Sequence, residues 1–279
     1  PFLTVPLPEE ERTGVISSVE ITGLTVGKFS YAYRMDEAFC LDPYAGAVEG
    51  RETFGAPMEK EEGACCCLLP EYPVMRTTSL HRPYEELMPS YEFFEWTSLT
   101  EPAYVYPAPA EEKRVNYWGY GTKALYFAPK ASYAASSDAV AEFAEMVDAL
   151  HENGIECLME FCFAPGTPSG FVLQVLHHWQ LRYQIDGFHL VGDASLAEEA
   201  SKDALLRKTK LIFLGFDGAR IYQGKRPWFR NLGEHNQGYQ YHIRRFLKGD
   251  EGSLSDFTYY LRRSPETHGV INYLADHDG

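Results

Sequence analysis

Carboxylate residues lie within or directly after several apolar segments of this chain. Glu160 lies inside the apolar segment 155–163, Asp193 follows "YQIDGFHLVG", and Asp217 follows "TKLIFLGF". Two carboxylates that meet in space could act as a general acid and a general base, and a single one could act as a nucleophile. The structural alternatives are a helix cap at Asp193, hydrogen bonding at Glu160 and a loop role at Asp217. Choosing between these roles requires the elements that position the side chains.

Helices and strands alternate from residue 116 onward. The segment "SSDAVAEFAEMVDALHENGI" predicts a helix that Ser137 or Asp138 caps and Gly154 ends, because apolar residues recur on one face. The short links predict parallel strands joined by right-handed crossovers, in either an open doubly wound sheet or a (β/α)8 barrel. No G-x-G-x-x-G follows a strand, so a dinucleotide site lacks support. Further helices are predicted over 169–183, 196–208 and 237–248, and strands over 155–163, 185–191, 209–216 and 269–276.

The chain before residue 116 has a different character. The segments 18–24 and 28–35 alternate apolar and polar residues, with glycine between them, which predicts short β-strands. Residues 56–110 are rich in Pro, Glu and aromatic residues and keep no period, which is unusual inside a compact domain. We therefore expect a β-rich segment over 1–55, an irregular linker with the start of the next domain over 56–115, and the alternating domain over 116–279.

Composition excludes several classes of function. The chain has 279 residues, 45% of them hydrophobic, which is enough for a substantial core. Its net charge of −15 argues against a duplex nucleic-acid surface, which requires clustered Lys and Arg. No apolar run approaches the roughly 20 residues that cross a bilayer, and no signal-peptide pattern opens the chain. The six cysteines lack metal-ligand spacing, so we expect reduced thiols, no metal, no cofactor, no membrane partner and a cytoplasmic location.

The segment "VNYWGYGTKALYFAPKASYA" resembles the α-amylase superfamily (glycoside hydrolase family 13), in particular its isoamylase and bacterial glycogen-debranching branch. The segments that follow resemble, in the family's order, the third barrel strand ("IECLMEFCF"), the fourth ("YQIDGFHLVGD"), the fifth ("TKLIFLGFD") and the seventh ("INYLADHDG"). Upstream, "YAYRMDEAFCLDPYAGAVEG" is similar to the end of a β-sandwich glucan-binding module. The resemblance implies a (β/α)8 barrel, incomplete in these residues, preceded by a small β-sandwich remnant.

The resemblance places apolar residues where the family carries its catalytic carboxylates. A retaining glycosidase needs two carboxylates about 5 Å apart, one as nucleophile and one as acid/base. Val191 stands in place of the nucleophile Asp, His189 in place of an orienting Arg, and Leu214 in place of the acid/base Glu. The seventh-strand pair His277 and Asp278 keeps its identity. The resemblance therefore implies that the standard catalytic residues are lost.

The resemblance also implies residues that contact a sugar. Tyr120 matches a stacking tyrosine of the family, and Tyr117 and Trp118 lie beside it at the mouth of the barrel. Aromatic rings pack against apolar faces, although core packing would explain many of the aromatic residues in a chain that contains 14% of them. The candidate substrate-binding residues are Tyr117, Trp118, Tyr120, His189, His277 and Asp278.

One unit of the family's barrel has no counterpart in this sequence. In "SLHRPYEELMPSYEFFEW", the part that resembles the lead into the first strand runs directly into the part that resembles the second strand, near Glu86 and Leu87. The sequence also ends before an eighth strand. Missing strands would leave exposed sheet edges. We therefore expect either a longer chain of which these residues are a part, or a truncated fragment that requires a partner.

Three functions remain open from the sequence. The first is a catalytically inactive debranching-enzyme homologue with a glucan-binding or regulatory role. The second is an active α-1,6 or α-1,4 glucan glycosidase with relocated carboxylates, for which Glu160 and Asp193 are the candidates because alternate residues share a strand face. The third is a scaffold protein without a sugar site. An α-glucan or maltooligosaccharide is the expected partner in the first two, and the oligomeric state stays open.

Overall fold

The computed structural model describes residues 3–7, 12–13, 16–17, 19–24, 27–35, 38–50, 65–68, 90–92, 100–102, 124–227 and 229–275. Several predicted features lie outside these residues: the aromatic residues Tyr117, Trp118 and Tyr120, the pair His277 and Asp278, and the junction at Glu86 and Leu87. Among the described residues, no helix is long and apolar enough to cross a membrane.

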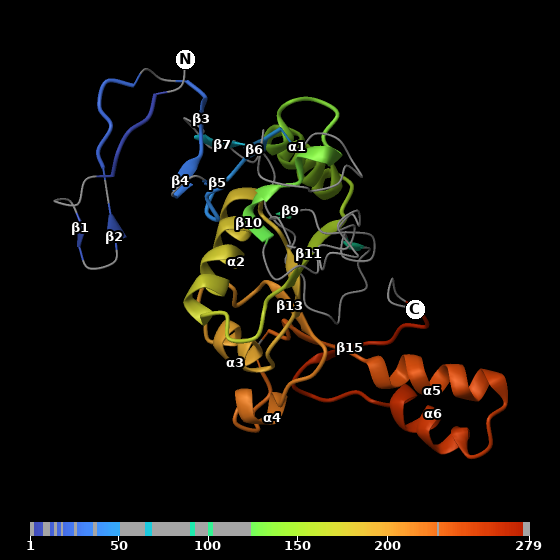
Figure 1. Ribbon diagram of the computed structural model, residues 1–279. Coiled ribbons are helices and arrows are strands. Elements are labelled where there is room, and N and C mark those ends of the chain that lie inside the picture. The colour runs from blue at the N-terminus through green and yellow to red at the C-terminus, as the bar shows by residue number, and fades with distance from the viewer. Residues whose placement is uncertain are drawn as a thin grey trace.

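A six-stranded parallel sheet forms the centre of the structure (Figure 1). Neighbouring strands follow one another in chain order, and every neighbouring pair is parallel. A doubly wound sheet reverses its strand order at a switch point, whereas consecutive order is that of a (β/α)8 barrel wall. The strand order therefore favours the second of the two predicted architectures. The strands are β8 (Ser90–Glu92), β11 (Glu156–Cys162), β12 (Gly187–Val191), β13 (Lys210–Phe213), β14 (Leu232–His235) and β15 (Gly269–Ile271).

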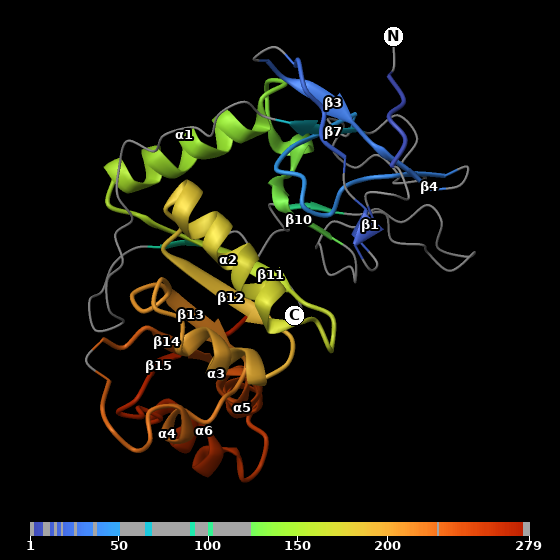
Figure 2. The ribbon, with the colours of Figure 1, turned by 90° about the vertical axis from the view of Figure 1, so that its left-hand side faces the viewer.

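Helices follow the strands, and those that precede β13 cover one face of the sheet (Figure 2). The first three pack their apolar residues against the sheet in one continuous core, with Trp179 and Tyr183 fully buried between helix and strand. The indole of Trp179 donates to the carbonyl of Tyr126 at 2.7 Å, so its one polar group is satisfied inside this core. The helices are α1 (Ala139–Glu152), α2 (Ser169–Tyr183), α3 (Ser195–Ser201), α4 (Gly218–Ile221), α5 (Gln237–Lys248) and α6 (Ser253–Leu261), with a short 3-10 helix, η3 (Ala131–Tyr133).

The sequence patterns predicted most of these elements. The side chain of Asp138 accepts a hydrogen bond from the amide of Ala141 and caps α1, and Gly154 takes a positive φ of 71° just after that helix. Two predicted elements were wrong. The segment 18–24 forms no strand in its described residues 19–24, where the apolar residues Val19, Ile21 and Leu24 are exposed and no buried face supports the alternation. The helix predicted over 196–208 ends at Ser201, because the carboxylate of Asp203 instead holds the amides of the next turn. The sequence analysis also missed β14, whose residues "LGEH" carry no β-branched side chain.

The N-terminal part forms small antiparallel sheets. β7 pairs with both β3 and β6, so a strand beyond residue 55 joins strands that precede it. The buried residues Leu125 and Ala128 of β10 pack with Leu41, Ala45 and Val48 in a second, smaller core. The strands are β1 (Arg12–Thr13), β2 (Ile16–Ser17), β3 (Phe29–Tyr31), β4 (Tyr33–Met35), β5 (Ala38–Cys40), β6 (Val48–Glu49), β7 (Cys65–Leu68), β9 (Thr100–Pro102) and β10 (Ala124–Pro129).

Candidate functional site

The face of the sheet opposite the helices carries the candidate residues. Glu160 of β11 pairs in register with His189 of β12, and Cys162 pairs with Val191 two residues further on. Alternate residues of a strand point to the same face, and the intervening residues Phe161 and Leu190 belong to the helix-facing core. Glu160, His189 and Val191 therefore share the face that would become the interior of a barrel.

The two positions at which the resemblance implies catalytic carboxylates lie level with each other. Leu190 pairs with Phe213, so Val191 and Leu214 each follow one residue beyond this pair, at the carboxyl ends of β12 and β13. Active sites of (β/α)8 barrels lie at this end of the strands. Val191 is half-buried, and the side chain of Leu214 is 47% exposed. The structure thus brings together the residues that the sequence analysis placed together, with hydrocarbon groups in both positions.

Glu160 is engaged by an imidazole. Its Oε2 lies 2.6 Å from Nδ1 of His189, and the two side chains are only 5% and 4% exposed. Burial of a carboxyl group is costly unless a polar group lies against it, and the imidazole of His189 supplies that contact. Glu160 is therefore a paired group on this face.

Two further aromatic residues extend this pair into a row. The rings of His189 and His235 lie 4.8 Å apart, and His235 stacks on Tyr273 at 4.0 Å with an angle of 13° between their planes. The row crosses β12 and β14 and continues to the segment after β15. The sequence analysis missed His235 because it did not recognise β14, and it did not single out Tyr273, which lies within the strand predicted over 269–276. Within the part of the chain that the structure describes, no three His, Cys, Asp or Glu side chains are arranged to hold a metal ion.

Asp193 lies at a helix terminus. Its exposed carboxylate accepts a hydrogen bond from the amide of Ser195 at 2.9 Å, at the start of α3. That backbone hydrogen bond, together with one from the Ser195 side chain, lowers the pKa of Asp193 below its usual value. Asp217 has a comparable role, because it caps α4 by accepting from the amide of Arg220 at 3.0 Å.

A second polar cluster lies at β14. Glu234 accepts hydrogen bonds from Nε and Nη2 of Arg263 at 2.9 and 2.7 Å, and its Oε2 lies 3.2 Å from Nε2 of His268. Burial works against the charged form of Glu234, but the hydrogen bonds from His268 and Arg263 prevail and lower its pKa. The cluster ties β14 to the segment between α6 and β15, which gives it a structural role.

Comparisons with known proteins first define the fold. The structure is similar to apo pullulanase from Paenibacillus barengoltzii, with a TM-score of 0.54 and 13% identity over 88% of this chain and 56% of that one. It is also similar to the catalytic module of the glycogen-degrading pneumococcal virulence factor SpuA, with a TM-score of 0.51 and 13% identity over 77% of this chain and 46% of that one. The chain thus has the fold of part of these catalytic modules.

Sequence relatives then define the branch. The chain is 22% identical to the chloroplastic isoamylase 3 of Oryza sativa subsp. japonica, over 97% of this chain and 51% of that protein. It is 27% identical to the glycogen debranching enzyme of Serratia proteamaculans (strain 568), over 59% of this chain and 35% of that enzyme. No family model matches the chain. These comparisons confirm the resemblance to the isoamylase and glycogen-debranching branch of glycoside hydrolase family 13.

The chain is also shorter than its relatives. It spans about half the length of the rice isoamylase and 35% of the Serratia debranching enzyme. The match to the rice protein extends over 411 residues, which exceeds the 279 residues of this chain. Within the matched span, the relative therefore contains segments that have no counterpart here.

Proposed function

We propose that this protein is a glucan-binding homologue of isoamylase-type debranching enzymes that has lost the standard hydrolytic mechanism. The observation that carries the proposal is the placement of Val191 and Leu214, level with each other at the carboxyl ends of adjacent strands. Neither side chain can attack an anomeric carbon or protonate a glycosidic oxygen, and a retaining mechanism requires both steps.

The bound partner in this proposal is an α-glucan or maltooligosaccharide. The names of the relatives support this choice, since they describe an isoamylase and a glycogen debranching enzyme. Tyr120 and Trp118 would stack on the sugar, and His277 and Asp278 would hydrogen-bond to it. The imidazole of His189 lies against Glu160, so in sugar binding His189 would shape the buried face rather than contact the ligand directly. The boundaries near residues 55 and 115 and the cytoplasmic location stay predictions.

A second candidate function is hydrolysis by relocated carboxylates. The observation that favours it is the Glu160–His189 pair, which places a carboxylate and an imidazole, the two groups most used in acid–base catalysis, on the barrel-interior face. Asp193 supports it less, because its carboxylate is already used at the N-terminus of α3. A single paired carboxylate would still need a second group to complete a retaining mechanism.

Binding and turnover measured together separate these functions from a scaffold without a sugar site. The full 279-residue chain would be incubated with glycogen, pullulan and maltooligosaccharides. The proposal predicts binding without release of reducing ends, and weaker binding after Tyr120→Ala or Trp118→Ala. Leu181→Ala is a matched control, because this exposed side chain lies on α2, away from the carboxyl ends of the strands. A lack of binding to all three glucans would leave the scaffold function instead.

A further inference from the structure

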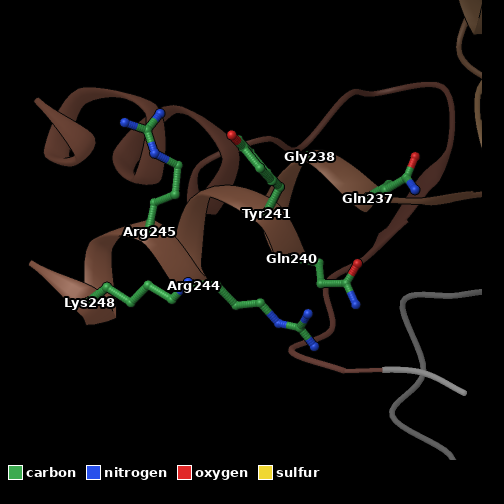
Figure 3. A pocket seen from close by; sticks show the side chains of 7 residues that line it. All are labelled: Gln237, Gly238, Gln240, Tyr241, Arg244, Arg245 and Lys248. Carbon is green, nitrogen blue, oxygen red and sulfur yellow. The ribbon is translucent and has the colours of Figure 1, made fainter. Parts of the chain in front are cut away.

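A cavity along α5 has no role in the function proposed above. It has a volume of ≈ 510 Å³, which lies within the roughly 300–1,000 Å³ of small-molecule sites. Figure 3 shows its residues strung along the helix from Gln237 at one end to Lys248 at the other. The residues that line it are Gln237, Gly238, Gln240, Tyr241, Arg244, Arg245 and Lys248.

The opposite face of α5 is held by α6. His242 stacks on Tyr260 at 4.7 Å, and Phe246 stacks on Phe257 at 4.4 Å. A Cβ at Gly238 would lie 2.2 Å from the Tyr260 ring, so the two helices approach as closely as a glycine permits. This contact fixes the helix that carries the cavity residues, and Figure 1 shows the α5–α6 pair projecting from the end of the sheet.

The cavity is positively charged in an acidic protein. Among the described residues, its lining includes Arg244, Arg245 and Lys248 and no carboxylate, although the net charge of the chain is −15. Asp250 lies 3.2 Å from Nε of Arg245 and partly offsets that guanidinium. Nε of Arg244 donates to the backbone carbonyl of Leu274 at 2.9 Å, which orients the guanidinium without neutralising its charge. Arg244 and Lys248 are both exposed.

The remaining lining residues suit a sugar. The amides of Gln237 and Gln240 both donate and accept hydrogen bonds, as hydroxyl groups do. The ring of Tyr241 is 60% exposed, with the guanidinium of Arg245 5.9 Å from its centroid, and it offers a flat apolar surface beside the cations. Guanidinium and ammonium groups bind phosphate oxygens through short charge-assisted hydrogen bonds.

We propose that the α5 cavity binds a phosphate monoester of a hexose, with Arg244 and Lys248 on the phosphate and Gln237, Gln240 and Tyr241 on the sugar. A phosphate monoester is close to a dianion at neutral pH, which matches two cations without a carboxylate between them. The ester belongs either to a free sugar phosphate or to a phosphorylated α-glucan chain. This site is independent of the sheet face on which the proposed function rests.

The test measures binding to the full chain by titration calorimetry. The probes are glucose 1-phosphate, a maltooligosaccharide carrying one phosphate monoester, and the same maltooligosaccharide without phosphate. We expect Arg244→Gln and Lys248→Gln each to weaken binding of the phosphorylated probe about tenfold, the size expected for a charge-assisted hydrogen bond. Lys225→Gln, an exposed lysine after α4, is the matched control and should bind as the unmodified protein does. If Arg244→Gln unfolds because its contact with Leu274 is lost, the affinity of Lys248→Gln alone decides the test.

The calorimetric results show whether the α5 cavity binds a phosphate monoester. Binding of both phosphorylated probes, or of one, that Arg244→Gln and Lys248→Gln weaken supports the site and identifies the source of the ester. Binding that neither variant weakens would overturn it. Three other results would also overturn the proposed site. The protein could bind the two oligosaccharides with equal affinity and not bind glucose 1-phosphate, or it could bind no phosphorylated probe. The control Lys225→Gln could also lose as much affinity as the Arg244 and Lys248 variants. If the protein binds the phosphorylated probes but does not bind neutral glucans, the α5 site is supported and the proposed glucan-binding function is contradicted.

Discussion

Nδ1 of His189 and Oε2 of Glu160 lie 2.6 Å apart, on neighbouring strands and at paired positions of the sheet. Both side chains are almost fully buried. The family resemblance places an arginine at the position of His189, beside the nucleophile. Here the imidazole instead engages the carboxylate of the adjacent strand. The structure therefore has a contact between His189 and Glu160 at the position where the resemblance implies an orienting arginine.

Removal of His189 should destabilise the fold. His189→Ala would leave Glu160 buried without this partner, and we expect a loss of about 1–3 kcal/mol in the free energy of unfolding, as for an unsatisfied buried polar group. Glu160→Gln should cost less, and the double variant should lose less than the sum of both single losses. Urea denaturation of the four proteins gives the coupling. Additive losses would mean that the two side chains do not stabilise each other.

Restoring single carboxylates should not create an enzyme. Val191→Asp or Leu214→Glu alone supplies one half of a unit whose members act together, so neither should release reducing ends from pullulan. The double variant should also stay inactive, because His189 stands where the resemblance implies the orienting arginine and a poorly supported carboxylate at half-buried Val191 tends to stay protonated. Turnover by either single variant would contradict this prediction, because it would show that neighbouring groups already supply the other catalytic function.

The cluster at Glu234 should make stability depend on pH. Its pKa is lower in the folded protein than the ordinary value of 4.5, so its stabilising contribution is complete above that pH. The contribution is then lost as the pH falls through the folded-state pKa. Arg263→Gln removes the guanidinium that binds Glu234 through two nitrogens, so the loss of stability at low pH should become smaller. Arg262→Gln, at the exposed neighbouring position, should leave that loss unchanged. Urea midpoints between pH 3 and pH 7 provide the measurement, and an equal loss of stability at low pH in the two variants would contradict the assignment.

The elements that the sequence predicted best are those with a strong local signal. α1 has a capping Asp138 and a regular apolar face, and α2 and α5 begin and end where their patterns do. β14 was missed because its four residues include a glycine, a glutamate and a histidine, and its place in the sheet comes from pairing with β13 and β15. Non-local pairing leaves little trace in a short segment.

The candidate site, too, could be predicted from the sequence only in part. The level placement of Val191 and Leu214 could be predicted, because strand ends and the family motif both specify it. The partner of Glu160 could not, since alternation gives the face of a side chain and not the atom that it contacts. Asp193 had two open roles in the sequence, and the hydrogen bond that its carboxylate accepts from the amide of Ser195 engages it just before α3, whose N-cap is Ala194.

Release of reducing ends from pullulan and glycogen by the purified full chain measures whether the standard hydrolytic mechanism is lost. With Val191 and Leu214 at the two carboxylate positions, we predict no release above the protein-free blank over a prolonged incubation, while glucan binding is retained. Sustained release by the unmodified protein that Glu160→Gln abolishes, in a variant that still folds, would show instead that the protein is an enzyme and that Glu160 is part of a relocated catalytic pair.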